Sequence, residues 1–313
     1  MSNTDIDCSI VVPVYYNQES LVKTFDLLDE EVVKKNKELN FEIIFIDDGS
    51  GDNSLSVLLE LKKAHQIVKV IKLSRNFGQG AAILAGYTYA HGKTLVTIAA
   101  DLQEPPELIN QMLEGYFKEN YHIVICTREA REESFFRRKT SHIFYGLIRR
   151  ISFPDMPKGG FDFFLISARV KDLIVRSNEK NPFLQGQVLW SGFKAKFIPY
   201  KRKDRETGKS RWTMAKKIKY LIDGMLAYSY LPLRFMSVVG IIISSLGFLY
   251  AILIFFSKIF GGIPIKGWAP TMIVILVLSG FQMLMLGIIG EYLWRTLDQV
   301  RHRDHFVVEE IYD

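Results

Sequence analysis

The chain has 313 residues, of which 48% are hydrophobic and 24% charged, a balance typical of folded globular proteins that excludes wholesale disorder. The formal net charge is +6, but the basic residues cluster beside two apolar segments, and no nucleic-acid-binding motif accompanies them. We therefore expect phosphate ligands and an anionic membrane surface as partners, and no nucleic acid.

Short apolar runs alternate with segments of helical periodicity through the first part of the chain. Because strands and helices that alternate at this spacing build parallel sheets, the pattern predicts an α/β domain on a mostly parallel, Rossmann-like sheet. In such sheets ligands bind at the carboxyl ends of the strands. The expected strands are 9–14, 41–46, 68–73, 94–98 and 123–127, and the expected helices are 20–39, 53–65, 80–91 and 107–119.

Two segments near the C-terminus, 235–257 and 267–290, contain no charged residue. Each is long enough to cross a hydrocarbon core of about 30 Å as a helix, and neither has a polar stripe. They predict a transmembrane hairpin with helices at about 235–257 and 268–292. Because Lys and Arg are dense on both flanks of the pair, the larger domain is expected on the cytoplasmic side of the cytoplasmic membrane.

The segment between the domain and the hairpin mixes lysines with aromatic residues, which predicts an amphipathic helix at the membrane interface. The expected organisation is therefore a domain at 1–211, an interfacial helix at 212–231, a transmembrane hairpin at 232–294 and a cytoplasmic tail at 295–313. The tail contains a short apolar run, 306–308, that is expected to form an edge strand. Its partner stays open, a neighbouring subunit being one candidate, and a homo-oligomer is expected.

Acidic side chains follow two of the expected strands. The segment Asp47-Asp48-Gly49-Ser50 is either an acidic turn that caps a helix or a pair of carboxylates that accept hydrogen bonds from a nucleobase or ribose. Asp101 follows the fourth strand, and Gln103 adds an amide oxygen two residues later. Two hard oxygens on one side of the chain suit Mg²⁺ or Mn²⁺, with substrate phosphates completing the coordination shell. Helix capping is the alternative, but it leaves Asp101 unexplained.

A glycine-containing segment, Gly78-Gln79-Gly80-Ala81-Ala82-Ile83, nearly matches a dinucleotide-binding fingerprint. Its sixth position is Ile83 rather than Gly or Ala, and it follows the third strand rather than the first. The segment therefore argues against an oxidoreductase.

Basic side chains follow the fifth strand and recur before the apolar segments. Arginine holds phosphate through paired N–H donors and keeps its charge, although a solvated helix face is the alternative interpretation. A second basic loop, 205–212, contains a glycine and could close over a diphosphate. The first group comprises Arg128, Arg131, Arg137 and Arg138, with Ser141 beside them.

Four motifs occur in a defined order along nearly the whole chain. They are Ser9-Ile10-Val11-Val12-Pro13-Val14-Tyr15, Asp47-Asp48-Gly49-Ser50, Asp101-Leu102-Gln103 with Pro105-Pro106, and Arg205/Gly208/Ser210/Arg211. In this order they resemble the family 2 glycosyltransferases, which have the GT-A fold. With the two C-terminal spans, the chain is similar to the polyprenyl-phosphate glycosyltransferase branch (the GtrB type, related to dolichyl-phosphate mannose synthase).

The resemblance implies a metal-dependent, inverting transfer of a hexose from a nucleotide sugar to a polyprenyl phosphate such as undecaprenyl phosphate. Glucose from UDP-glucose is the expected donor, with mannose, N-acetylhexosamine and aminoarabinose as alternatives. The resemblance further implies donor binding by Pro13, Tyr15, Glu19, Asp47, Asp48, Arg205, Ser210 and Arg211, lipid-phosphate binding by Arg128, Arg131, Arg137, Arg138 and Ser141, Mg²⁺ or Mn²⁺ binding by Asp101 and Gln103, and catalytic roles for Asp101 and Asp155.

The chain departs from the family pattern at two places. Ala99 stands where family members usually carry Asp, which either weakens metal binding or shifts it to Asp101 alone. Tyr16-Asn17 replaces a common Asn-Glu pair, which affects the assignment of Glu19. Two other classes compete with the transferase. A processive synthase would need more membrane spans, and a non-catalytic nucleotide-sugar-binding scaffold would tolerate the loss of Asp101.

Overall fold

A computed structural model describes most of the chain as two compact units, and each unit is described by itself. One unit comprises the described residues of Met1–Gly224 together with Asp304–Asp313, and the other those of Met225–Arg303. The interfacial helix expected at 212–231 falls outside the described residues, apart from its last residue. The described residues are 5–128, 146, 149–150, 153–157, 160–177, 179, 183–201, 231–260, 267–301 and 303–313.

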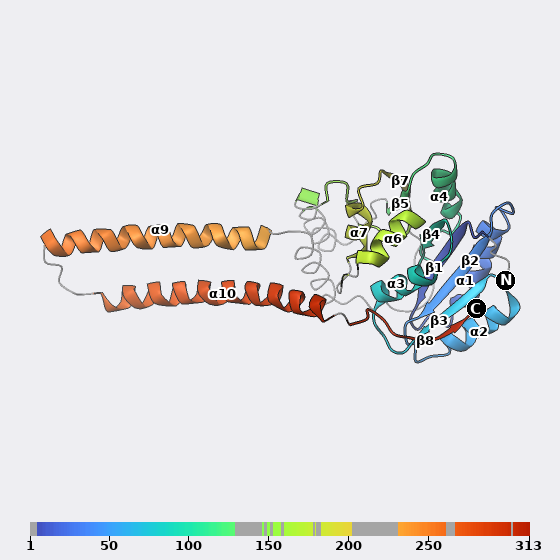
Figure 1. Ribbon diagram of the computed structural model, residues 1–313, viewed down its shortest axis with the longest axis horizontal. Helices are drawn as coiled ribbons and strands as arrows, with labels where there is room; N and C mark the ends of the chain where they lie inside the picture. The colour runs from blue at the N-terminus through green and yellow to red at the C-terminus, as the bar shows by residue number, and fades with distance from the viewer. Residues whose placement is uncertain are drawn as a thin grey trace. The chain divides into compact units, whose positions relative to one another are not determined.

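The first unit is built on an eight-stranded sheet with the order β7-β5-β6-β4-β1-β2-β3-β8 (Figure 1). β6 and β8 are antiparallel to their neighbours, and the other pairs are parallel. The predicted mostly parallel α/β sheet is therefore confirmed. The strands are β1 (Cys8–Val14), β2 (Phe41–Asp47), β3 (Val68–Leu73), β4 (Thr94–Thr97), β5 (Ile123–Arg128), β6 (Phe164–Ser167), β7 (Ala195–Tyr200) and β8 (Val308–Tyr312).

Helices cover both faces of this sheet. On one face Ile10, Val12 and Phe45 belong to a core cluster that also contains apolar side chains of α1, α2 and α4. On the other face a methyl group added to Gly86 of α3 would lie 2.5 Å from Val11 Cγ1, so only glycine permits this close helix–strand contact. The helices are α1 (Leu21–Leu28), the π-helical turn η1 (Asp29–Val33), α2 (Ser54–Ala64), α3 (Gln79–Tyr89), α4 (Leu108–Phe117), α6 (Ala168–Ser177) and α7 (Leu184–Trp190).

The first helix is shorter than the sequence predicts. The expected helix 20–39 is α1 followed by η1, which ends at Val33. The Asn36 side chain donates hydrogen bonds to Val32 O at 2.8 Å and to Asn110 Oδ1 at 2.6 Å. An asparagine side chain that bonds to the backbone in this way offers an alternative to continued helix, and here it accompanies the helix end.

The C-terminal strand has its partner within the same chain. β8 pairs with β3 in the register Val70↔Tyr312, and the two strands lie side by side in Figure 1. The Lys72 and Glu309 side chains form an ion pair at 2.7 Å across this ladder. The strand predicted at 306–308 therefore begins two residues later, at Val308. Its partner is β3 of the same chain, not a strand of a neighbouring subunit.

The second unit consists of two long helices, α9 (Leu231–Phe260) and α10 (Trp268–Val300) (Figure 1). They contact one another, with Gly240 Cα facing the Met285 side chain closely enough that an added Cβ would lie 3.8 Å from Met285 Cε. Each contains a segment long and apolar enough to cross a membrane, Leu233–Tyr250 and Val277–Val300. Apolar side chains such as Phe248 and Met283 are each 69% exposed, which would be costly in water.

Candidate active site

The candidate residues meet at the edge of the sheet where the parallel strands have their carboxyl ends, here called the C-terminal edge. β6 runs the other way, so the residues before it, including Asp162, also lie at this edge. Adjacent strands are about 4.8 Å apart, so the strand order gives the order of the side chains. From one end of the edge to the other, the order is Tyr200 (β7), Arg128 (β5), Asp162 (before β6), Asp101 (after β4), Tyr15 (after β1), Asp47 (end of β2) with Asp48 (after β2), and Arg75 (after β3).

Asp48 joins the loop after β2 to the loop after β3. Its carboxylate accepts hydrogen bonds from Phe77 N at 2.7 Å, Gly78 N at 2.9 Å and Asn76 Nδ2 at 3.0 Å. The side chain is buried, and this burial raises the pKa of Asp48 to about 6, although the two backbone amides lower it and the neighbouring charge of Asp47 raises it further. Asp48 therefore holds the two loops together through buried hydrogen bonds.

Gly49 allows these two loops to approach. Its φ is +69°, and a Cβ there would lie 2.6 Å from Arg75 C and 2.7 Å from Asn76 N. Backbone atoms cannot move aside as a flexible side chain would, so only glycine fits. The preceding Asp47 is 1% exposed and accepts a hydrogen bond from Ser50 N at 3.1 Å. Burial raises the pKa of Asp47, and its hydrogen bonds with Ser50 lower it in part.

The loop after β1 is tied to the loop after β2. Tyr16 has φ +58°, a left-handed conformation that is uncommon outside glycine, and its N–H donates to Ser50 Oγ at 3.0 Å. Tyr15 N donates to Asn17 Oδ1 at 3.0 Å. Of the remaining residues predicted here, Pro13 is half-buried in β1 and Glu19 is exposed. The structure thus brings Tyr15, Asp47 and Asp48 together where β1 and β2 end. These three residues are here called the acidic group, after the two carboxylates.

Asp101 and Gln103 form a tight turn after β4. Gln103 N donates to Asp101 Oδ1 at 3.3 Å, and the intervening Leu102 has φ +60°. A buried hydrogen bond of 2.5 Å from Ser20 Oγ to Ala100 O fixes the start of this turn against the beginning of α1. Left-handed backbone in a non-glycine residue costs free energy and is common at functional sites.

The oxygens of Asp101 and Gln103 fit Mg²⁺ or Mn²⁺ by their chemistry. Both ions prefer hard oxygen ligands, and Mg²⁺ is often held by only one or two carboxylates together with substrate phosphates and water. Among the residues that the structure describes, no group of three or more His, Cys, Asp or Glu side chains could hold a metal ion. A site at Asp101 would therefore need phosphate oxygens from a ligand to complete it.

Arg128 is the last residue of β5 and lies beside Tyr200 in the β5–β7 ladder. Its Nη2 donates to Asp162 Oδ2 at 2.5 Å, and its side chain also hydrogen-bonds that of Tyr200. Burial alone would lower the pKa of Arg128, but the nearby carboxylate of Asp162, the hydrogen-bonded Tyr200 and the buried Glu104 raise it above its usual value. The guanidinium is thus a fixed cation, and the Arg128 side chain as a whole is 26% exposed.

Asp155 is exposed in a turn closed by a 3.0 Å hydrogen bond from Met156 N to Phe153 O. The buried side chains of Phe153 and Met156 flank it and hold the turn. Seven further predicted residues lie outside the described part of the chain: Arg131, Arg137, Arg138, Ser141, Arg205, Ser210 and Arg211.

Residues 9–173 match the model of glycosyl transferase family 2. The chain belongs to glycosyltransferase family 2. The resemblance inferred from the four ordered motifs is confirmed, and the protein is an enzyme of the glycosyltransferase class.

Relatives of this family 2 glycosyltransferase match it over almost its full length. It is 40% identical over 308 residues to the uncharacterized glycosyltransferase YkcC of Bacillus subtilis, covering 98% of this chain and 94% of that protein. It is 30% identical over 302 residues to the bactoprenol glucosyl transferase of Shigella phage SfV, covering 96% and 97%. A solved structure, glucosyl-3-phosphoglycerate synthase from Mycobacterium tuberculosis, matches 70% of this chain and 80% of its own with 15% identity and a TM-score of 0.47.

Sequence reasoning missed several residues that the structure places at or near the candidate site of this family 2 glycosyltransferase. Arg75 is exposed at the C-terminal edge, with its guanidinium 4.4 Å from the centre of the Phe77 ring. Asp162 and Gln185 belong to the surroundings of Arg128, and Gln185 Nε2 donates to Asp162 Oδ1 at 3.0 Å. The sequence offered one indication of Asp162: the apolar run directly after it resembles the other strands of the sheet and could have predicted β6.

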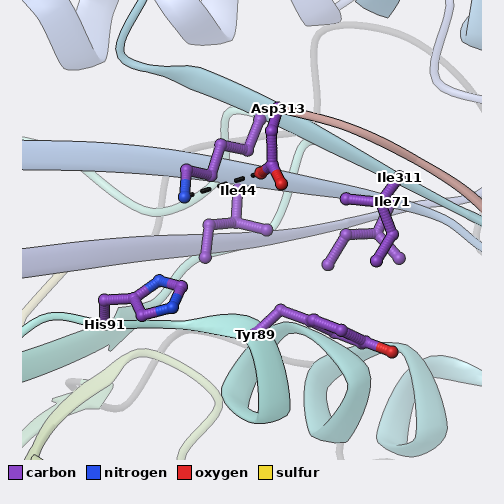
Figure 2. A pocket seen from close by; sticks show the side chains of 7 residues that line it. Ile44, Ile71, Tyr89, His91, Ile311 and Asp313 are labelled. Atoms are coloured by element: carbon purple, nitrogen blue, oxygen red, sulfur yellow. Dashed lines mark ion pairs between the residues drawn. The ribbon is translucent and has the colours of Figure 1, made fainter. Parts of the chain in front are cut away.

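A small cavity of about 30 Å³ lies away from these residues, between the sheet, the end of α3 and β8. Figure 2 shows Tyr89 and His91 on one side of it and Ile311 and Asp313 on the other. The end of α3 lies near the starts of the parallel strands, opposite the C-terminal edge. The cavity is too small for a nucleotide and is not part of the candidate site.

Proposed function

We propose that the enzyme transfers glucose from UDP-glucose to a polyprenyl phosphate, with inversion, at the cytoplasmic face of the cytoplasmic membrane. The observation that carries this proposal is the full-length similarity to a bactoprenol glucosyl transferase, which extends through both apolar helices. The strand order supports it, because Asp101 lies between the acidic group and the cationic Arg128. The same arrangement of residues would serve the transfer of another hexose. The identity of the sugar therefore rests on the similarity to the glucosyl transferase and not on the geometry of the site.

On the donor side, the acidic group would bind the nucleotide. Buried carboxylates such as Asp47 can accept hydrogen bonds from a nucleobase or from ribose hydroxyls, while Asp48 holds the loop that presents Arg75. Asp101 and Gln103 would hold Mg²⁺ or Mn²⁺, which would neutralise charge on the leaving diphosphate. Arg205, Ser210 and Arg211 remain candidates for the diphosphate, and Pro13 and Glu19 remain candidates for donor contacts.

On the acceptor side, Arg128 would hold the lipid phosphate, with Arg131, Arg137, Arg138 and Ser141 as further candidates. An oxygen of that phosphate attacks C1 of glucose, the bond from C1 to the β-phosphate oxygen breaks, and UDP leaves with the electron pair. A phosphate monoester has a second pKa of about 6, so the nucleophile is largely ionised near neutral pH. Asp155 would then orient the acceptor more than deprotonate it, and positioning would supply most of the rate.

The two apolar helices would hold this site at the bilayer, where the prenyl chain resides. The domain boundaries predicted from the sequence, 1–211, 212–231, 232–294 and 295–313, are part of this proposal, with 308–312 returning to the sheet. We also expect the exposed apolar helices to favour a homo-oligomer.

The test is a transfer assay with the purified full chain in detergent, undecaprenyl phosphate, Mg²⁺ or Mn²⁺ and a panel of radiolabelled nucleotide sugars. We expect label from UDP-glucose to enter the lipid fraction, and Asp101→Asn to lower kcat by about 100-fold or more. Asp172→Asn is the matched control, because Asp172 is an exposed carboxylate on α6, which begins at the opposite edge of the sheet. Nucleotide binding without transfer from any donor would contradict the proposal and favour a binding scaffold.

A further inference from the structure

Arg128 depends on other side chains for its position. An arginine side chain loses roughly 2 kcal/mol of rotamer entropy when it is fixed, so a site that must recognise a phosphate gains from fixing it beforehand. The only hydrogen-bonded anion that the structure describes beside this guanidinium is Asp162. A guanidinium carries five N–H donors, and the Arg128 side chain is 26% exposed, so donors remain beyond those that bind Asp162 and Tyr200.

Asp162 itself is 53% exposed and needs support to stay in place. It lies two residues before β6, and continuing the antiparallel register from Ile125↔Phe164 brings it opposite Thr127, the neighbour of Arg128. Gln185 of α7, which is 5% exposed, supplies the support. Its Nε2 donates to Asp162 Oδ1 at 3.0 Å and to Phe161 O at 2.5 Å, which uses both N–H groups of the amide.

We propose that Gln185 is a positioning residue for the acceptor phosphate, acting through Asp162 on the guanidinium of Arg128. This inference rests on the proposed function and adds to it a residue that never touches the substrate. Gln185 fixes the carboxylate, the carboxylate fixes the guanidinium, and the remaining N–H donors of the guanidinium meet the phosphate. Since the acidic group is on the other side of Asp101 along the sheet edge, the effect is specific to the acceptor.

The same short helix provides a matched control. Gln187 lies two residues further along α7, is 6% exposed, and donates from Nε2 to Ser177 Oγ of α6 at 2.9 Å. Both glutamines therefore attach α7 to a neighbouring segment through one buried amide. They differ in what they hold, because only the Gln185 amide is bonded to the partner of Arg128.

The experiment compares Gln185→Met with Gln187→Met in the full chain. It measures the Kd for radiolabelled undecaprenyl phosphate, the Kd for UDP and the KM values of transfer. Loss of one hydrogen bond to a charged group predicts a rise of about tenfold in both the Kd and the KM for the lipid in Gln185→Met. The Kd for UDP should stay unchanged in both variants, and Gln187→Met should leave the lipid values unchanged. The double variant Gln185→Met/Asp162→Asn should bind the lipid no more weakly than Asp162→Asn alone.

Equal losses of thermal stability in the two variants, with unchanged lipid Kd and KM, would overturn the inference and leave Gln185 as a structural attachment. Additive effects of Gln185→Met and Asp162→Asn on the lipid Kd would also overturn it. The binding measurement separates this failure from failure of the proposed function, in which the unmodified enzyme itself would neither bind nor glycosylate undecaprenyl phosphate. That result would overturn both.

Discussion

At the scale of single residues, Asp48 combines a structural task with an unusual proton affinity. Its carboxylate is 3% exposed and holds two backbone amides and an asparagine side chain of the next loop. The ionised form accepts these bonds best, yet burial raises the pKa of Asp48 to about 6 because the charge is desolvated. The carboxylate is therefore neutral in mild acid, where it is a poorer acceptor.

This property predicts a pH-dependent difference in stability between the enzyme and Asp48→Asn. The folded protein keeps the proton of Asp48 up to about pH 6, whereas the unfolded chain releases it near the ordinary value of 3.8. Between these values the folded state binds more protons, so the stability contributed by Asp48 falls as pH rises and is constant above about pH 7. The asparagine variant has no such proton.

The check is the melting temperature of both proteins from pH 4.5 to 7.5. The difference in the free energy of unfolding between the unmodified enzyme and Asp48→Asn should shrink by about 2 kcal/mol across this window, because the interval between the two pKa values covers about 1.5 pH units of it and each pKa unit corresponds to about 1.4 kcal/mol. Asp172→Asn controls for the loss of one exposed carboxylate. Parallel curves for the enzyme and Asp48→Asn would contradict the prediction.

At the scale of secondary-structure elements, β8 closes an edge of the sheet that would otherwise be open. Its ladder with β3 is reinforced by the ion pairs of Lys72 with Glu309 and of Lys69 with Asp313, the second at 3.5 Å. These pairs are partly exposed and each contributes little, about 0–1 kcal/mol. The backbone ladder and the packing of Tyr312 against the core carry the attachment.

Deletion of residues 308–313 should therefore expose β3 and promote edge-to-edge association. Hydrogen–deuterium exchange of peptides that contain Val68–Leu73 should become faster, and the deleted protein should aggregate at lower temperature. Glu309→Gln is the control, since it removes an ion pair and keeps the ladder. Unchanged exchange in β3 after the deletion would show that β8 does not protect this edge in solution.

The elements that the sequence predicted are those that can be recognised from the pattern of residues within one short segment. Buried parallel strands such as Ile43–Ile46 read as continuous apolar runs, and the polar residues that follow them were found for the same reason. β6, an antiparallel strand inserted between β4 and β5, and β7, a parallel strand on the other side of β5, were missed because both depend on pairing with strands far along the chain. The apolar run after Asp162 could have indicated a strand, but the pairing that brings Asp162 and Gln185 to Arg128 leaves no local pattern in the sequence.

At the scale of the whole molecule, a folded glycosyltransferase sheet and two exposed apolar helices occupy one chain. Water would penalise the exposed side chains of α9 and α10, such as Phe248 and Met283, whereas hydrocarbon would not. We expect the full chain to stay in the membrane pellet after extraction with alkaline carbonate.

A charge in the centre of each apolar segment tests this expectation. Leu246→Lys together with Leu284→Lys should shift part of the chain to the supernatant, because a charge at the bilayer centre costs about 3 kcal/mol on insertion scales. Leu246→Ala together with Leu284→Ala is the control and should stay in the pellet. Recovery of the unmodified chain in the carbonate supernatant would contradict membrane spanning.

The position of β8 in the sequence has a consequence for biosynthesis. A chain is made from its N-terminus, and its domains tend to fold in that order. Here the strand that completes the first sheet is translated after both apolar helices. While α9 and α10 are being translated, the nascent sheet has to remain with its β3 edge unpaired. Emergence of residues 308–312 from the ribosome is therefore the event that permits the sheet to close, and a transcript truncated directly after α10 would yield both helices but an enzyme with an unpaired β3 edge.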